Sequence, residues 1–256
     1  MFRPRIIPVL LLKGRGLVKT IRFSDSRYIG DPINAVKIFN DLGADELVFL
    51  DITASREKRS ISEEIVKEIG DEAYMPFSVG GGISSVEQIG SLLSYGAEKV
   101  VLNTNAARNV QLIREASAVY GNQSIVVSID VKKSFFKKIN IYLNSGKEKT
   151  NLDLIDYVKQ VTEAGAGEIL INSIDRDGTY QGYDIDLIKE VSKNTALPVI
   201  ACGGAASLND MKDAFILGGA SACAAGSMFV FHGPRKGVLV NYPDKSDLRE
   251  FFKNAF

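Results

Sequence analysis

Two glycine-rich turns stand at matching places in the two halves of the chain, at residues 80–82 and 203–204. Each turn follows a short apolar run and precedes a stretch with helical spacing. Backbone N–H groups in such a turn, beside a helix N-terminus, bind phosphate. Each half then reaches a second apolar run with a small polar end, Asn103 and Thr104 in the first, Gly226 and Ser227 in the second. The spacing therefore predicts one cleft that holds a ligand with two phosphates.

Acidic residues that end apolar runs are the candidates for proton transfer. Asp130 closes a run of six mostly apolar residues, and Asp51 and Asp177 stand at comparable places. The repeat aligns residues 129–132 with residues 10–13, so Leu11 occupies the place of Asp130 in the first half. The motif around Asp177 fits either a functional acid or an ordinary polar turn. The pattern thus predicts one proton-transferring group where its symmetry calls for two.

These residues need elements that carry them to one end of a barrel. Apolar runs rich in β-branched residues alternate with amphipathic segments such as residues 32–42. Expected strands start near Ile6, Glu46, Pro76, Lys99, Ser124, Glu168, Pro198 and Ala222. Eight strand–helix units predict a single α/β domain over residues 1–256, a (βα)8 TIM barrel made of two (βα)4 halves at about 1–120 and 121–256. Capping boxes are expected at Ser84 with Glu87 and at Ser207 with Asp210.

Composition narrows the function classes. The chain has 31 basic and 31 acidic residues among 256, which argues against a nucleic-acid binder. No apolar run reaches the roughly 18 residues that a membrane span needs, and the N-terminal apolar run fits a strand better than a signal peptide. Cys202 and Cys223 lie in apolar runs and predict free buried thiols in a cytoplasmic protein. With His232 as the only histidine, no metal or other cofactor is expected.

Several segments together resemble the cyclase-subunit family of imidazole glycerol phosphate synthase, from histidine biosynthesis. The resemblance runs nearly end to end. Its segments are residues 5–8, 30–32, 45–55, 79–83, 165–169 and 175–179. It implies a (βα)8 barrel and a substrate with a phosphate at each end. It also implies a glutaminase subunit docked on the N-terminal face of the barrel, from which ammonia passes through the barrel to the active site.

Residue by residue, the resemblance assigns two phosphate grips and an ammonia gate. One grip would comprise Gly82, Asn103 and Thr104. The other would comprise Gly178, Gly204, Gly226 and Ser227, although the family usually has alanine at Gly226. The gate would comprise Arg5, Glu46, Lys99 and Glu168. Further active-site positions would be Lys19 in the first loop and Asp51. Glu98 stands where the family usually has an aspartate that faces the glutaminase.

The resemblance is weaker in the chemistry. The family uses two aspartates as acid–base groups. The second matches Asp130, and the first falls on Leu11. Asp177 is a further candidate for a catalytic acid. General acid–base catalysis is worth about 10²–10⁴-fold, so ordinary cyclase turnover should be impaired. Val9 and Asn172 also replace the usual cysteine and threonine, and the tail at residues 238–243 is foreign to the histidine enzyme.

These departures resemble a paralogue group that accompanies acetamidino modification of bacterial surface sugars. There the barrel and its glutaminase are thought to supply ammonia to a sugar amidotransferase. Leu11, residues 18–20 and residues 241–243 fit that group. Two alternatives stay open. One is an authentic cyclase that relies on Asp130 alone or on a substitute acid at Asp51 or Asp177. The other is a non-catalytic scaffold that binds a phosphorylated ligand and a partner protein.

Overall fold

Eight parallel strands close into a barrel, as the sequence predicts. The structure, a computed structural model, describes residues 3–135 and 138–253. The barrel strands are β1 (Arg5–Lys13), β4 (Leu47–Asp51), β5 (Phe77–Gly80), β6 (Lys99–Leu102), β7 (Ile125–Lys133), β10 (Glu168–Ser173), β11 (Val199–Cys202) and β12 (Ala222–Ala225). They pair in the order β10-β11-β12-β1-β4-β5-β6-β7, and β7 pairs with β10 to close the ring. All eight predicted strand starts are confirmed to within one residue.

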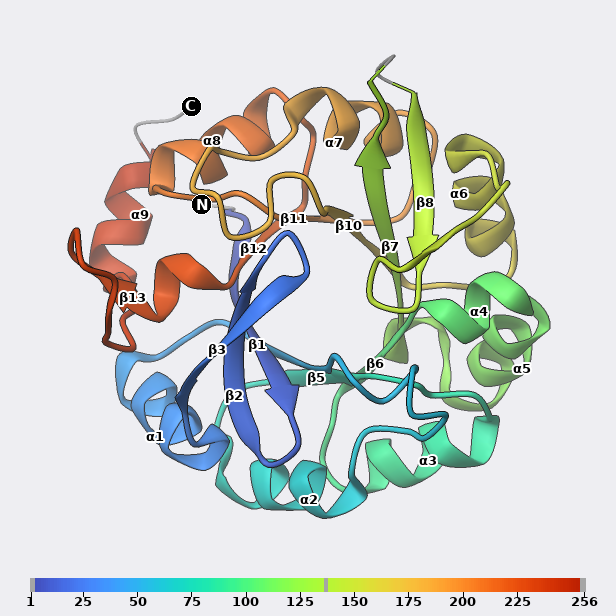
Figure 1. The fold of residues 1–256 in the computed structure, drawn as a ribbon, viewed down its shortest axis with the longest axis horizontal. Coiled ribbons are helices and arrows are strands. Elements are labelled where there is room, and N and C mark those ends of the chain that lie inside the picture. The colour runs from blue at the N-terminus through green and yellow to red at the C-terminus, as the bar shows by residue number, and fades with distance from the viewer. Residues whose placement is uncertain (1–2, 136–137, 254–256) are drawn as a thin grey trace.

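Helices surround this barrel (Figure 1). They are α1 (Pro32–Leu42), α2 (Glu63–Glu72), α3 (Val86–Ser94), α4 (Thr104–Arg108), α5 (Gln111–Tyr120), α6 (Leu154–Glu163), α7 (Ile185–Ser192), α8 (Leu208–Ile216) and α9 (Lys245–Lys253). The segment at residues 32–42 forms the predicted helix. Its proline starts the first turn, the Asp31 carboxylate accepts the N–H of Asn34, and Gly43 ends it in the left-handed conformation. The short elements are η1 (Asn122–Ser124), η2 (Ser227–Phe229), β13 (Phe231–His232) and β14 (Gly237–Val238).

One of the two predicted capping boxes is confirmed. Ser207 and Asp210 bond reciprocally at the start of α8. The box at Ser84 and Glu87 was wrong by one residue, because α3 begins at Val86 and Ser85 is its N-cap. The Ser85 hydroxyl accepts the N–H of Gln88, while the Gln88 side chain accepts the N–H of Ser84. Ser84 therefore lies one residue outside the helix, where its N–H is bonded by the side chain of the first turn.

An antiparallel hairpin follows the first barrel strand of each half. β2 (Gly16–Ile21) and β3 (Ser24–Gly30) extend β1, and β8 (Ile139–Leu143) and β9 (Glu148–Lys149) extend β7. Both lie at the carboxyl end of the barrel (Figure 1). Leu11 stands opposite Val18 in one extension, and Asp130 stands opposite Tyr142 in the other. The structure therefore gives Leu11 and Asp130 equivalent positions, as the aligned repeat predicts.

The barrel interior is apolar between its two ends. Side chains of a strand alternate between its two faces, so Arg5, Ile7, Val9 and Leu11 share the inner face of β1. The inner cluster comprises Ile7, Val9, Val48, Val101, Val126, Leu170, Ile200, Ala222 and Ala224. Cys202 and Cys223 are both free thiols. Among the described residues, no helix has the length and apolar character to cross a membrane.

Candidate functional site

One pocket opens at the carboxyl end of the barrel, where the strands end. It collects every residue that the sequence predicts for the substrate end. These are Leu11, Lys19, Asp51, Gly82, Asn103, Thr104, Asp130, Asp177, Gly178, Gly204, Gly226 and Ser227. The two glycine turns and the candidate acids thus share one cavity, although Asp51 and Gly204 lie far apart in the sequence. Their roles as phosphate ligands and acid–base groups stay predictions.

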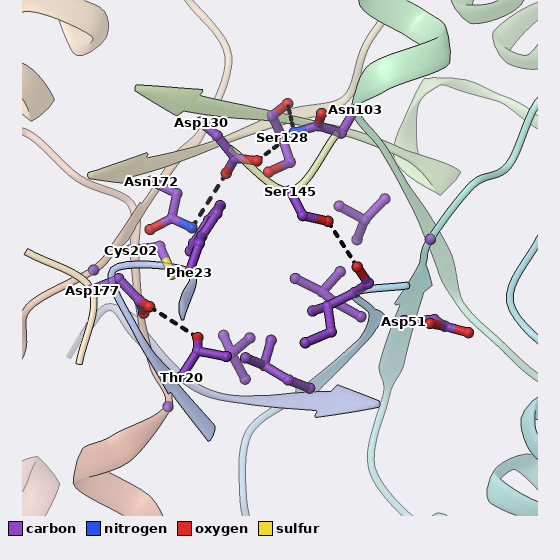
Figure 2. A pocket seen from close by; sticks show the side chains of 18 of the residues that line it. Thr20, Phe23, Asp51, Asn103, Ser128, Asp130, Ser145, Asn172, Asp177 and Cys202 are labelled. Atoms are coloured by element: carbon purple, nitrogen blue, oxygen red, sulfur yellow. Dashed lines mark hydrogen bonds between the residues drawn. The ribbon is translucent and has the colours of Figure 1, made fainter. Parts of the chain in front are cut away.

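Asp130 is the candidate acid whose surroundings best fit proton transfer. It is buried at the end of β7, where its Oδ2 accepts the amide of Asn103 at 2.9 Å and its Oδ1 accepts that of Asn172 at 3.3 Å (Figure 2). Burial raises the pKa of Asp130 to about 7, against the two amides, which act to lower it. Both protonation states are therefore accessible near neutral pH, which suits a general acid or base.

Asn172 also offers an unused acceptor. Its Oδ1 is buried and has no hydrogen-bond partner among the described residues. A buried carbonyl oxygen without a partner carries a substantial desolvation cost. The same side chain lines the pocket, and its amide nitrogen is the part that faces Asp130 (Figure 2).

Asp177 lies on the other side of the pocket, under the β2–β3 hairpin. Its Oδ2 accepts the hydroxyl of Thr20 at 3.3 Å (Figure 2). Its backbone carbonyl accepts the N–H of Arg22 at 3.0 Å. Burial raises the pKa of Asp177, while Lys19 acts to lower it. These contacts fasten the hairpin across the barrel mouth and place Lys19 inside it.

Lys19 is buried with its ammonium against the backbone of β1. Its Nζ donates to the carbonyl of Val9. Burial lowers the pKa of Lys19 to about 8, although the Asp177 carboxylate acts to raise it. Gly226 makes this position possible, because a Cβ at 226 would lie 3.2 Å from Lys19 Cε, and closer still to Nζ. Gly226 therefore provides the space that the Lys19 side chain fills.

Asp51 lines the pocket but is fully engaged in its own loop. Its Oδ1 accepts the N–H groups of Thr53 and Ala54 at 2.9 and 3.1 Å, and its Oδ2 pairs with Arg59 at 2.6 Å. Figure 2 shows the carboxylate turned away from Asp130 and Asp177. Of the two substitute acids that the sequence offers, Asp177 is the better placed.

The glycine turns are shaped by close backbone approach. Gly82 has φ of 65°, and a Cβ there would lie 3.1 Å from the backbone of Ala54. Gly204 has φ of 111°, and a Cβ there would lie 3.0 Å from both Gly182 and Arg176. Since an L side chain is strained in this conformation and lacks space, both positions require glycine.

Sequence reasoning missed the part of the pocket that comes from the hairpins and the loop after β4. Phe23, Arg56, Ser145 and Lys147 all line it. The Ser145 hydroxyl donates to the carbonyl of Ile52 at 2.8 Å, which joins the β8–β9 turn to the first half of the barrel. A usable signal was present: residues 144–146 are Asn-Ser-Gly between two β-like runs, and all three have positive φ.

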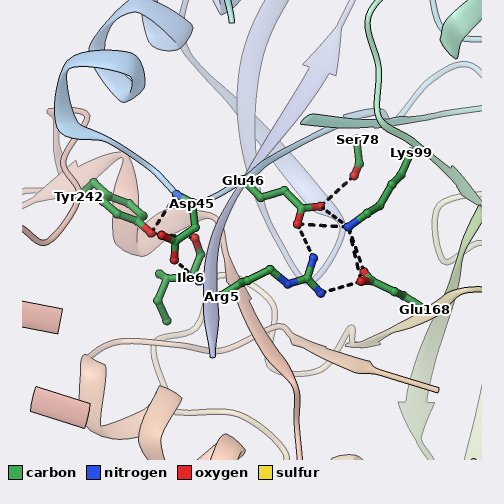
Figure 3. A network of polar contacts seen from close by, with 8 residues as sticks. All are labelled: Arg5, Ile6, Asp45, Glu46, Ser78, Lys99, Glu168 and Tyr242. Atoms are coloured by element: carbon green, nitrogen blue, oxygen red, sulfur yellow. Dashed lines mark hydrogen bonds and ion pairs between the residues drawn. The ribbon is translucent and has the colours of Figure 1, made fainter. Parts of the chain in front are cut away.

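The four predicted gate residues meet at the opposite end of the barrel. Arg5 bonds Glu46 at 2.5 Å and Glu168 at 2.7 Å, and Lys99 lies 3.3 Å from Glu46 and 3.4 Å from Glu168 (Figure 3). The two cations and two carboxylates alternate, so each charge has two opposite neighbours. We call this set, Arg5, Glu46, Lys99 and Glu168, the charge ring. Ser78 adds a hydrogen bond to Glu46 at 3.0 Å.

Comparison with known proteins decides the family. A family described as "Histidine biosynthesis protein" matches residues 5–234. The chain belongs to this family. A Leptospira borgpetersenii protein, provisionally named imidazole glycerol phosphate synthase subunit HisF, is 46% identical over 253 residues, covering 98% of this chain and 100% of the relative. The Pseudomonas aeruginosa protein provisionally named subunit hisF2 is 45% identical over 248 residues, covering 97% and 99%. Subunit HisF of Alkaliphilus metalliredigens is 43% identical over 232 residues, covering 91% and 92%.

We expect the burial of Asp130 to make the free energy of unfolding of this HisF-like barrel depend on pH. Because folding raises the pKa of Asp130 from 3.8 to about 7, the folded protein holds a proton that the unfolded chain has lost. The free energy of unfolding therefore falls as pH rises from about 4 to about 7. We expect Asp130→Asn to remove this dependence and to raise the free energy of unfolding at about pH 8 by about 2 kcal/mol.

Urea unfolding of both proteins at about pH 5 and about pH 8 measures this difference. Asp213→Asn, which neutralises an exposed carboxylate on α8, is the matched control. Equal changes in the two variants, or a wild-type stability that rises over this pH range, would contradict the assignment of a proton to buried Asp130.

Proposed function

We propose that this HisF-like barrel receives ammonia from a glutaminase subunit at its N-terminal face and releases it at the carboxyl-end pocket. We further propose that the ammonia serves acetamidino modification of a surface sugar, through a sugar amidotransferase, in place of imidazole glycerol phosphate synthesis. The observation that carries the proposal is the contrast between the two ends. The charge ring is complete, whereas the pocket has Leu11 where its counterpart half has Asp130.

The path between the two ends supports passage of a neutral molecule. Above the charge ring, the inner faces of the strands carry the apolar cluster that includes Ile7, Val48 and Leu170. An ammonium ion would lose its hydration there at a cost of several kcal/mol, whereas neutral ammonia would not. Because the charges of the ring are all paired with one another, they leave no isolated charge to hold the molecule at the entrance.

The pocket end supports a phosphorylated small-molecule ligand. The two glycine turns supply backbone N–H groups, and Arg56 and Lys147 are exposed pocket residues that form no ion pair within residues 3–135 and 138–253. Cations without an acidic partner beside a glycine turn suit an anion. The numbered name of the P. aeruginosa relative, hisF2, also fits a copy separate from an ordinary HisF.

An authentic cyclase is the second candidate, and a specific observation favours it. Asp130, with a pKa of about 7, and Asp177, whose pKa is also raised by burial, share the pocket. Two carboxyl groups with raised pKa values could divide the acid and base roles without any group at Leu11.

One experiment separates the two candidates. The purified protein would receive the ribulosyl substrate of the histidine pathway with excess ammonium salt, and, in parallel, a co-expressed glutaminase subunit with glutamine. The proposal expects cyclase turnover at least about 10²-fold below that of an ordinary HisF, together with stimulated glutamine hydrolysis. Ordinary cyclase turnover would overturn the sugar proposal. Absence of any effect on the glutaminase would overturn the ammonia proposal.

A further inference from the structure

The segment after β14 runs back along the outside of the barrel. The N–H of Leu239 donates to Val230 at 3.0 Å, and that of Asn241 donates to Phe229 at 2.9 Å. The ring of Tyr242 packs on Phe229 with centroids 5.5 Å apart. Tyr242 is buried, and these contacts direct its hydroxyl to the N-terminal ends of β1 and β4.

The Tyr242 hydroxyl joins two strands. It donates to the carbonyl of Ile6 at 2.9 Å and accepts the N–H of Asp45 at 3.3 Å. The Asp45 carboxylate in turn accepts the N–H of Ile6 at 3.0 Å and binds Arg3 through both oxygens, at 2.6 and 2.8 Å. Figure 3 shows Tyr242, Asp45 and Ile6 beside the charge ring. We call Arg3, Asp45 and Tyr242 the outer clamp.

The outer clamp replaces strand pairing that is absent at this point. The pairing of β1 with β4 begins at Val9 and Val48. Nearer the N-terminal end, the N–H and the carbonyl of Ile6 bond side chains of the clamp. Because buried backbone groups need partners, the separation of the two strands at this end depends on Tyr242 and Asp45.

The clamp and the charge ring lie on opposite faces of β1 and of the residues that lead into β4. Ile6 follows Arg5, and Asp45 precedes Glu46, and neighbouring residues of a strand point to opposite faces. The ring joins Arg5 to Glu46 on the inside, while the clamp joins Ile6 to Asp45 on the outside. We propose that Tyr242 is a positioning residue for the charge ring. Through its bonds to Ile6 and Asp45, it holds the neighbouring Arg5 and Glu46 at pairing distance. Its consequence for ammonia transfer rests on the proposed function.

Tyr242→Phe tests the clamp in the full chain, since it removes only the hydroxyl. Tyr183→Phe is the matched control, because the buried Tyr183 hydroxyl donates to the backbone of another barrel strand, at Ala224, over 2.9 Å. Hydrogen–deuterium exchange of peptides that cover the starts of β1 and β4 should accelerate at least about fivefold in the first variant, with no change there in the control. Unaltered exchange at both strand starts in Tyr242→Phe would overturn the proposal.

A double-mutant cycle with Arg5→Met separates positioning from a general loss of stability. If Tyr242 acts through the Arg5–Glu46 pair, Tyr242→Phe should lower the Tm of the Arg5→Met protein by less than half of the shift that it causes in wild type. Tyr183→Phe should cause equal shifts in both backgrounds. Additive shifts for Tyr242→Phe would show an anchor for the tail alone, and the proposal would fail.

A third measurement uses the glutaminase. In the complex, Tyr242→Phe should reduce the stimulated kcat of glutamine hydrolysis at least about threefold with little change in KM, whereas the control should not. Should the wild-type barrel give no stimulation, the proposed function fails while the exchange and Tm results still decide the role of Tyr242. If the wild-type barrel stimulates the glutaminase and Tyr242→Phe stimulates it equally, the outer clamp has a structural role alone. That result would overturn its link to the function of the charge ring.

Discussion

Replacing Leu11 with aspartate is expected to raise ammonium-dependent turnover of the ribulosyl substrate by about 10²-fold, the lower part of the range for general acid–base catalysis. Leu11 and Asp130 hold equivalent places, since each lies in a barrel strand and pairs with the following hairpin. A carboxyl group at 11 would therefore enter the pocket opposite Asp130, with both glycine turns unchanged. Steady-state kinetics with excess ammonium salt measures the gain.

Leu11→Asn is the control, because asparagine is polar and similar in size to aspartate but has no carboxyl group to exchange a proton. A gain shared by both variants would assign the effect to polarity. No gain in Leu11→Asp, with folding intact, would mean that the pocket has diverged from the histidine enzyme beyond this position. In the double variant Leu11→Asp with Asp130→Asn, the gain should be lost, because the two carboxyl groups are expected to act as a pair.

Replacing Lys99 with methionine is expected to lower the free energy of unfolding by about 2–4 kcal/mol. The Lys99 side chain is only 11% exposed and lies between Glu46 and Glu168, so its removal leaves two buried carboxylates that share Arg5 alone. Removing one partner of a buried ion pair costs more than the pair itself contributes, because the remaining charge stays desolvated. Urea unfolding at neutral pH measures the loss.

The control for Lys99→Met is Arg15→Met, which also removes a cation bonded to two glutamates. The Arg15 side chain is 60% exposed, so water screens its ion pairs and its loss should cost far less than the loss of Lys99. Adding Glu168→Gln to Lys99→Met should recover part of the stability. Similar losses from the Lys99 and Arg15 variants would mean that water screens the charge ring as it screens a surface pair.

The sequence allowed prediction of the barrel and most of its pocket because these follow from local rules. Each strand start is marked by an apolar run, and parallel strands of a barrel bring their carboxyl ends together. That rule alone places Gly82, Asp130 and Gly204 in one cavity. The hairpins were missed because they extend β1 and β7 beyond the barrel, where charged and polar residues hide the strand pattern.

Contacts between distant residues lay beyond such reasoning. Tyr242 bonds Ile6 and Asp45 across 236 and 197 residues, and no spacing in the sequence marks those partners. Likewise, Asp51 stands at a strand end like a catalytic acid, and only the fold of the following loop places Arg59 against it. Strand-end position predicts that a side chain faces the pocket, but its hydrogen-bond partners decide whether it is available.

Burial of the Lys19 amine makes the packing of the β2–β3 hairpin over the pocket sensitive to pH. The pKa of Lys19 falls from 10.5 to about 8 when the chain folds, so burying the charged amine costs about 3 kcal/mol below pH 8. This cost decreases as pH rises from about 8 toward 10.5, because the amine of the unfolded chain then loses its proton as well. Contacts such as that of Thr20 with Asp177 hold the hairpin in place despite this cost. The charged amine at the pocket wall is therefore a feature that packing alone would disfavour, which fits a role toward an anionic ligand.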